Sequence, residues 1–240
     1  MRCDARRCSG MQSWRALSCA VVSCLLAVCL TGLAHSAAAQ EEPAGEPAWR
    51  SLLSDVRVDR DAVSGEWRND GEELRVAAAE GARLQLDVVP TGEYDFRVAF
   101  TRESGSDSIA LFIPTAIGQA SFEVDAWGER LGGLQNVDGQ SIRDNPTRRN
   151  AMALRNGKRH EMVVQVRRDR IRGALDGRTV FLLRTEGVAL SMADLWRLPE
   201  SDRLGIGAWN AATVFHSIDF RQIASDEAAI AATGGSTTVP

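Results

Sequence analysis

The stretch from Phe122 to Glu129 (FEVDAWGE) holds the residues best suited to chemistry. Its alternating apolar residues predict a strand with one face in a core, because successive side chains of a strand point to opposite faces. Glu123, Asp125 and Trp127 would then share the other face. An indole covers the C–H face of a sugar ring and carboxylates accept its hydroxyl groups. This composition therefore favours a carbohydrate site.

A second group of polar and aromatic residues extends the predicted carbohydrate site. Trp209 ends one predicted strand, Asn210 follows it, and Asn145 lies in a long polar loop. Together with Asp125 and Trp127 they are the predicted carbohydrate-binding residues on an open sheet face and its rim. The alternative interpretation is that both tryptophans are buried core residues.

The candidate acid/base residues for an enzyme are Glu123, Asp125 and His216. A lone histidine within a strand is more often structural than catalytic. Glu123 and Asp125 can alternatively be ordinary residues on the solvent-facing side of the strand. The spacing shows no Ser/His/Asp or Cys/His arrangement and no multi-histidine metal signature. The sequence thus names acid/base candidates without indicating a reaction.

Calcium is the one cofactor that the residue types suit. Asp138, Asp144 and Asn145 in the loop 138–150 offer oxygen ligands of the kind that Ca²⁺ takes. Their spacing matches no EF-hand loop. No other cofactor is expected.

The element around which the chain is organised is the stretch 92–114. It reads as two long strands joined by a polar turn, a hairpin that is apolar on one face and needs a second layer to cover it. From residue 65 to 223 the chain continues as about a dozen short strands separated by turn signals. A glycine-rich edge strand is expected over 131–137 and one or two helical turns over 189–196. This pattern predicts an all-β fold, an antiparallel two-sheet sandwich of the jelly-roll, concanavalin A-like type.

The 240-residue chain divides into four expected parts. Residues 1–39 resemble a secretory signal peptide, with an apolar run after Arg15 and small residues before Gln40. Translation is expected to start at Met11, because a start at Met1 gives an unusually long segment before the apolar run. The alternative is an uncleaved anchor. Residues 40–64 are the linker and domain entry, 65–223 the sandwich, and 224–240 a disordered tail. The protein is therefore expected to be exported and, after cleavage, to have no membrane span.

Charge and cysteine content exclude several classes of function. All five cysteines precede residue 40, so the remaining chain has no disulfide and no cysteine-based chemistry. Removing residues 1–39 takes away four arginines and one aspartate and leaves a net charge of −7. An acidic chain without a phosphate-binding glycine loop is not expected to bind nucleic acid.

Several segments in order resemble the laminin-G/concanavalin A-like jelly-roll domains of secreted bacterial proteins. They include GEYDFRVAF, FEVDAWGERLGG, LRNGKRHEMVVQVR and LGIGAWNAATVFHSIDFR, and they cover residues 65–223. The chain is also distantly similar to the 3-keto-disaccharide hydrolase family, although Ser104 to Ser108 (SGSDS) stands where that family has its NSG-type segment. Jelly-roll β-glucanases carry E-x-D-x-E or E-x-D-x-x-E on such a strand. Here the pattern is stretched to Glu123, Asp125 and Glu129.

The sequence leads to one functional hypothesis and two alternatives. The first is an exported carbohydrate-binding or cell-surface interaction module whose partner is a carbohydrate or cell-surface glycan. The resemblance implies the first alternative, a glycoside hydrolase or lyase related to 3-keto-disaccharide hydrolases. The second alternative is an adhesion or scaffold domain without a ligand.

Overall fold

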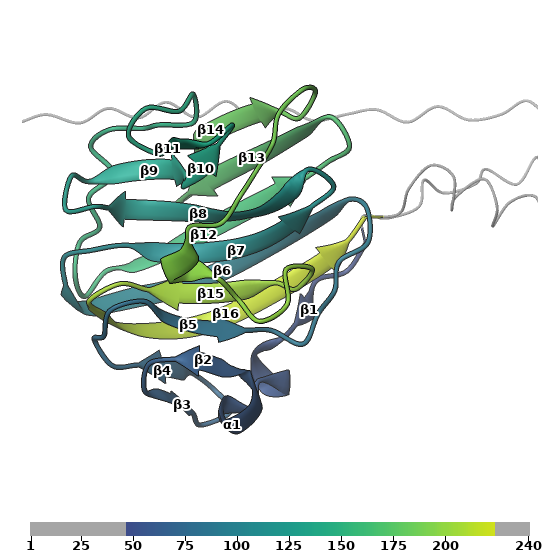
Figure 1. Cartoon of the computed structure of the whole chain (residues 1–240). Helices are drawn as coiled ribbons and strands as arrows, with labels where there is room; N and C mark the ends of the chain where they lie inside the picture. Colours follow the sequence, from purple (N-terminus) through teal and green to yellow (C-terminus); the bar gives the residue numbers. More distant parts are fainter. Residues whose placement is uncertain (1–46, 224–240) are drawn as a thin grey trace, which may run out of the picture. The chain divides into compact units, whose positions relative to one another are not determined.

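The computed structural model describes residues 47–223 of the chain (Figure 1). The expected signal peptide, the start of the linker and the expected tail lie outside the described residues. Within residues 47–223 no helix is both long and apolar enough to cross a membrane.

The described residues form two large antiparallel sheets that pack as a sandwich, which confirms the predicted fold class. The eight-stranded sheet runs in the order β14-β13-β12-β6-β16-β4-β3, with β1 also paired to β16. Its strands are β1 (Arg50–Ser51), β3 (Trp67–Asn69), β4 (Leu74–Val76), β6 (Tyr94–Gly105), β12 (Arg159–Val166), β13 (Arg170–Leu175), β14 (Arg178–Arg184) and β16 (Ala211–Gln222).

The six-stranded sheet runs in the order β2-β5-β15-β7-β8-β9. Its strands are β2 (Ala62–Ser64), β5 (Ala82–Gln85), β7 (Ile109–Thr115), β8 (Gly118–Ala126), β9 (Leu131–Leu134) and β15 (Gly205–Ala208). A small two-stranded sheet pairs β10 (Asn136–Val137) with β11 (Gln140–Ser141). The short helices are η1 (Leu53–Asp55), α1 (Val58–Asp61) and η2 (Asp194–Trp196). The glycine-rich strand β9 lies at the sheet edge, as predicted.

The core lies between the two sheets and follows the period-two pattern of the sequence. Phe96 and Phe100 enter it from β6, Leu111 from β7 and Phe122 from β8, and all four are fully buried. Each such side chain contributes about 1.5–3 kcal/mol to stability. The alternation therefore holds both sheets together through one continuous apolar layer.

The predicted hairpin over 92–114 is wrong. β6 pairs with β12 and β16 in one sheet, whereas β7 pairs with β8 and β15 in the other. The polar turn between them crosses from one sheet to the other. Alternation specifies which face of a strand is buried but not its hydrogen-bonding partner, and here the two apolar faces oppose each other across the core.

The outer face of the six-stranded sheet carries a second, smaller apolar cluster. Phe112, the neighbour of Leu111 on β7, points outward and packs against Trp196 and Leu198. These two residues belong to the segment between β14 and β15, which crosses over this face (Figure 1). The helical turns expected over 189–196 are reduced to η2. This segment, which we call the covering segment (residues 185–204), forms one wall of the site described next.

Candidate functional site

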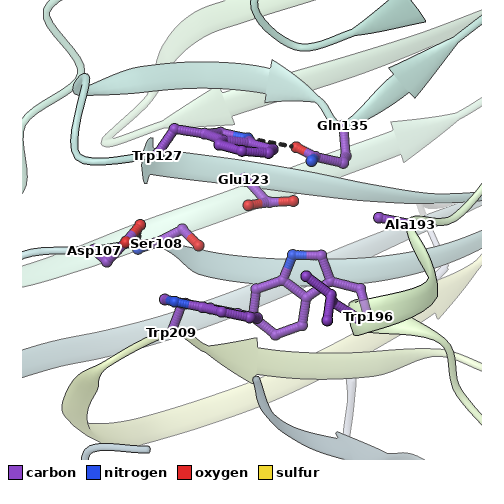
Figure 2. Close-up of a pocket in the computed structure, with 9 residues that line it drawn as sticks. Asp107, Ser108, Glu123, Trp127, Gln135, Ala193, Trp196 and Trp209 are labelled. Atoms are coloured by element: carbon purple, nitrogen blue, oxygen red, sulfur yellow. Dashed lines mark hydrogen bonds between the residues drawn. The ribbon is translucent and has the colours of Figure 1, made fainter. Parts of the chain in front are cut away.

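A cavity of about 310 Å³ opens on the outer face of the six-stranded sheet. Three tryptophans, two carboxylates and four other residues line it: Asp107, Ser108, Glu123, Trp127, Gln135, Ala193, Leu195, Trp196 and Trp209. Trp127 and Gln135 lie on one side, Trp196 and Trp209 on the opposite side, and Glu123 between them (Figure 2). The site thus combines flat apolar walls with a carboxyl group at the bottom of the cavity.

Glu123 is placed at the base by the alternation of β8. Its neighbour Phe122 points into the core, so Glu123 points to the outer face. The residues paired with it are Ala110 on β7 and Gly133 on β9, both small, which leaves room for the carboxyl group. Only 2% of Glu123 is exposed.

The hydrogen-bond partners of Glu123 are all neutral. Ser121 donates through its hydroxyl at 3.1 Å, and the side chains of Ser108 and Trp196 are its other partners. Burial raises the pKa of Glu123 to about 7, the charge of Asp107 adds to the rise, and the three hydrogen bonds oppose it. Near neutral pH this carboxyl group is therefore divided between its protonated and ionised forms.

Asp107 and Ser108 come from the connection between β6 and β7. The backbone N–H of Ser108 donates to the Asp107 carboxylate at 2.8 Å, and Trp209 donates its backbone N–H to the Ser108 carbonyl at 2.8 Å. Burial raises the pKa of Asp107. The crossing that replaces the predicted hairpin thus delivers a second carboxylate to the cavity.

Trp127 forms the upper wall and remains 43% exposed. Its backbone is left-handed, with φ of 64°, and its indole N–H donates to the Gln135 side chain at 3.1 Å. The guanidinium of Arg143 lies 4.1 Å from the ring centroid and is itself paired with Glu129. Glu129, the outer glutamate of the stretched glucanase-like pattern, is thereby held outside the cavity wall.

The lower wall is a pair of indoles. Trp196 and Trp209 meet edge to face at 5.3 Å between centroids, and Trp196 packs on Phe112 at 5.4 Å. Trp196 is buried, whereas Trp209 is half-buried. Edge-to-face packing of this kind fixes the orientation of both rings.

The expected placement of Asp125 beside Glu123 and Trp127 is wrong. A register shift between Val124 and Ala126, with φ of 57° at Asp125, turns its side chain away from the outer face. Its carboxylate pairs with Arg102 at 2.9 Å and accepts the backbone N–H of Leu154 at 2.9 Å. Both charged side chains are at most 5% exposed. The carboxylate of Asp125 is therefore engaged in contacts within the protein and does not point into the cavity.

Asn145 is also engaged within the protein. It is 3% exposed, its amide N–H₂ donates to the Leu134 carbonyl at 2.8 Å, and its amide oxygen accepts from Thr147. Asn210 is exposed beside Trp209 and lies outside the cavity lining. Of the five residues predicted to bind carbohydrate, Trp127 and Trp209 line the cavity.

His216 lies on β16 of the other sheet. One ring nitrogen is 2.9 Å from the Thr101 hydroxyl and the other 2.9 Å from the Glu73 carboxylate. Both nitrogens therefore have protein partners, and His216 does not join Glu123 in the cavity.

The loop donors expected for calcium do not gather into a site. Asp138 accepts the backbone N–H of Ala189 at 2.8 Å, Asp144 is exposed, and the amide group of Asn145 is occupied as described. Among residues 47–223 no group of three or more His, Cys, Asp or Glu side chains is placed to hold a metal ion.

Sequence reasoning missed Asp107, Ser108, Gln135 and the covering-segment residues Ala193, Leu195 and Trp196. The sequence places Asp107 in the polar turn, and Asp107 and Ser108 in the SGSDS stretch, without indicating a binding site. One signal could have pointed to Trp196: a tryptophan in the short helical stretch 189–196 is a large side chain of the kind that is mostly buried in folded proteins.

No protein-family model matches the chain, and no curated protein sequence matches it. The proposed kinship with 3-keto-disaccharide hydrolases has therefore no support from sequence comparison. The solved structures provide the only matches.

Three solved structures illustrate the similarity. A Crh5 transglycosylase in complex with NAG has 11% identity and a TM-score of 0.51, over 75% of this chain and 85% of its own. The Ca²⁺-bound exoplasmic/lumenal domain of VIP36 has 12% identity and a TM-score of 0.50, over 73% and 89%. The carbohydrate-binding module CBM66 from Bacillus subtilis has 15% identity and a TM-score of 0.46, over 74% and 98%. At such low identity, the similarity to the transglycosylase and to VIP36 shows only a shared fold, a concanavalin A-like antiparallel sandwich.

Proposed function

We propose that this protein is an exported carbohydrate-binding module that holds a sugar in the tryptophan-lined cavity. One observation carries the proposal: Trp127 faces Trp196 and Trp209 across a cavity of about 310 Å³ with Glu123 at its base (Figure 2). Export rests on the predicted signal peptide, and N-terminal sequencing of the secreted protein is expected to begin at Gln40.

The composition of the cavity suits a sugar ring. Trp127 and Trp209 offer exposed indole surface on opposite sides, and indoles pack against the C–H faces of sugars. Glu123, Asp107, Ser108 and Gln135 offer hydrogen-bonding groups between these walls. A cavity with apolar walls and a few convergent polar groups is typical of small-molecule sites.

The experiment is a glycan array on the purified protein, followed by titration calorimetry on the best glycan. Trp127→Ala and Trp209→Ala are each expected to weaken binding at least about tenfold, or ~1.4 kcal/mol, because each removes one wall.

Trp49→Ala is the matched control. Trp49 is a half-buried tryptophan that stacks with Arg97 and Arg221 away from the cavity, so its loss should leave glycan affinity unchanged. An array without any bound glycan, or equal losses in all three variants, would contradict the proposal. The first result would favour a scaffold domain.

The second candidate function is a glycoside hydrolase using the same cavity. Glu123, with a pKa of about 7, has the protonation behaviour of a general acid, and Asp107 supplies a second carboxyl group in the same cavity. Release of reducing sugar from the bound glycan, abolished by Glu123→Gln, would establish the enzyme. Glycan binding without hydrolysis would contradict the hydrolase and agree with the proposed carbohydrate-binding module.

A further inference from the structure

The cavity is acidic and holds no cation of its own. Its polar lining consists of the carboxylates of Glu123 and Asp107, the hydroxyl of Ser108 and the amide of Gln135. No lysine, arginine or histidine is among the described lining residues. A ligand in this cavity therefore meets two carboxyl groups and no positive charge.

Two arginines next to the lining, Arg102 and Arg143, are already paired with other carboxylates. Arg102 donates to the backbone carbonyl of Asp107, but its charge is paired with Asp125 at 2.9 Å in a buried salt bridge. Arg143 stacks on Trp127, is not among the residues that line the cavity, and is paired with Glu129 at 2.5 Å. Neither arginine compensates the charge of Glu123.

Glu123 therefore lacks a counter-charge inside the protein. Glu123 is only 2% exposed, and its partners Ser121, Ser108 and Trp196 are all neutral. A buried carboxylate without a cation is unfavourable, and a ligand that brings a positive charge relieves this cost. An acidic sugar would instead place like charges together.

The tryptophan walls also favour a cation. The faces of indole rings attract ammonium groups through their negative electrostatic potential, and tryptophan does so best among the aromatic side chains. Trp127 on one side and Trp209 on the other bring such rings to the same cavity as the carboxylates. The carboxylates and the indoles thus both favour a ligand that carries a positive charge.

We infer that the sugar bound in this cavity carries a protonated amino group, as in oligosaccharides of glucosamine, with the ammonium placed between Glu123, Asp107 and the indoles. This inference rests on the proposed carbohydrate-binding function and specifies its ligand. N-acetylated, neutral and acidic sugars lack the positive charge and bind more weakly.

The test compares three oligosaccharides of equal length by titration calorimetry on the intact protein at pH 7. These are a glucosamine oligomer, an N-acetylglucosamine oligomer and a glucose oligomer, all with the same β-1,4 linkage. The glucosamine oligomer is expected to bind roughly tenfold more tightly than either of the others. Glu123→Gln is expected to abolish this preference, and Asp107→Asn to reduce it.

Glu161→Gln provides the matched control, because Glu161 is a partly exposed glutamate on β12 of the other sheet. It should keep the full preference. The wild-type preference should fall towards pH 5.5, because Glu123 becomes protonated there. It should also fall towards pH 8.5, because the amino group of a glucosamine residue, lowered in basicity by the neighbouring oxygens, loses its proton.

Two negative results are distinguishable. Equal binding of all three oligomers by the wild type, or a preference that survives in both Glu123→Gln and Asp107→Asn, overturns the inference and leaves the proposed function standing. Absence of binding by all three oligomers, together with an empty glycan array, overturns both.

Discussion

At the scale of single residues, the environment of Glu123 makes the stability of the protein depend on pH. Its pKa is raised from the model-compound range to about 7 by burial, so the folded protein binds more protons than the unfolded chain between pH 4.5 and 7. Stability contributed by the protonated group is therefore lost as the pH rises through this range. A shift of this size corresponds to about 3 kcal/mol.

The substitution Glu123→Gln tests this dependence. At pH 8 the variant is expected to be more stable than the wild type by about 1–3 kcal/mol, because it removes a buried charge and keeps the shape of the side chain. At pH 5 the two proteins should unfold at similar urea concentrations. Urea unfolding at both pH values measures the difference, and a pH-independent difference would contradict the assignment.

At the scale of elements, the covering segment depends on Trp196 to hold it against the sheet. Trp196 is 3% exposed, packs on Phe112 and meets Trp209 edge to face. The segment contains the three-residue helix η2 and one isolated bridge, between Leu190 and Val137. Hydrogen bonds such as that from Arg83 to the Arg197 carbonyl also tie it to the sheet. Next to the cavity, the packing of Trp196 adds to these bonds.

Trp196→Ala is expected to cost about 3 kcal/mol of stability, since it leaves a void under the segment, and to weaken glycan binding. Leu182→Ala on β14, a residue 62% exposed, is the control and should cost less than about 0.5 kcal/mol. Chemical denaturation and calorimetry check both. Should Trp196→Ala lose neither stability nor affinity, the covering segment would not form the wall described here.

At the scale of the whole molecule, stability derives from the core between the two sheets. The described part of the chain has no cysteine, since all five lie within the first 29 residues, and the described residues gather no acidic or histidine cluster for a metal. The apolar layer from β6, β7, β8 and β16 is therefore the main source of cohesion.

Neither a reducing agent nor EDTA is expected to shift the thermal midpoint of the protein by more than about 1 °C. EDTA should likewise leave glycan affinity unchanged, because the cavity is lined by residues that form no metal cluster. Differential scanning calorimetry with and without added Ca²⁺ measures the first effect. A clear rise in the midpoint with Ca²⁺ would reveal an ion site and contradict this expectation.

The fold class and part of the site could be predicted from the amino-acid sequence. The period-two pattern of residues such as Phe96 and Phe122 depends only on the geometry of a strand, so it identifies buried faces without knowledge of their partners. The same alternation placed Glu123 and Trp127 on the outer face, and Trp209 was a candidate because it ends a predicted strand next to Asn210. Composition also excluded disulfides within residues 30–240, because no cysteine follows residue 29.

The pairing of the strands and the contacts between distant residues could not be predicted from the sequence and are known from the three-dimensional structure. Alternation does not encode pairing partners, so the crossing of Asp107 and Ser108 from one sheet to the other was not visible. One bulge reversed the direction of Asp125, because a single extra residue in a ladder turns a side chain away from its expected face. Trp196 reaches the cavity from a segment about 70 residues further along the chain than Glu123, and such contacts form only when the core has brought the sheets together.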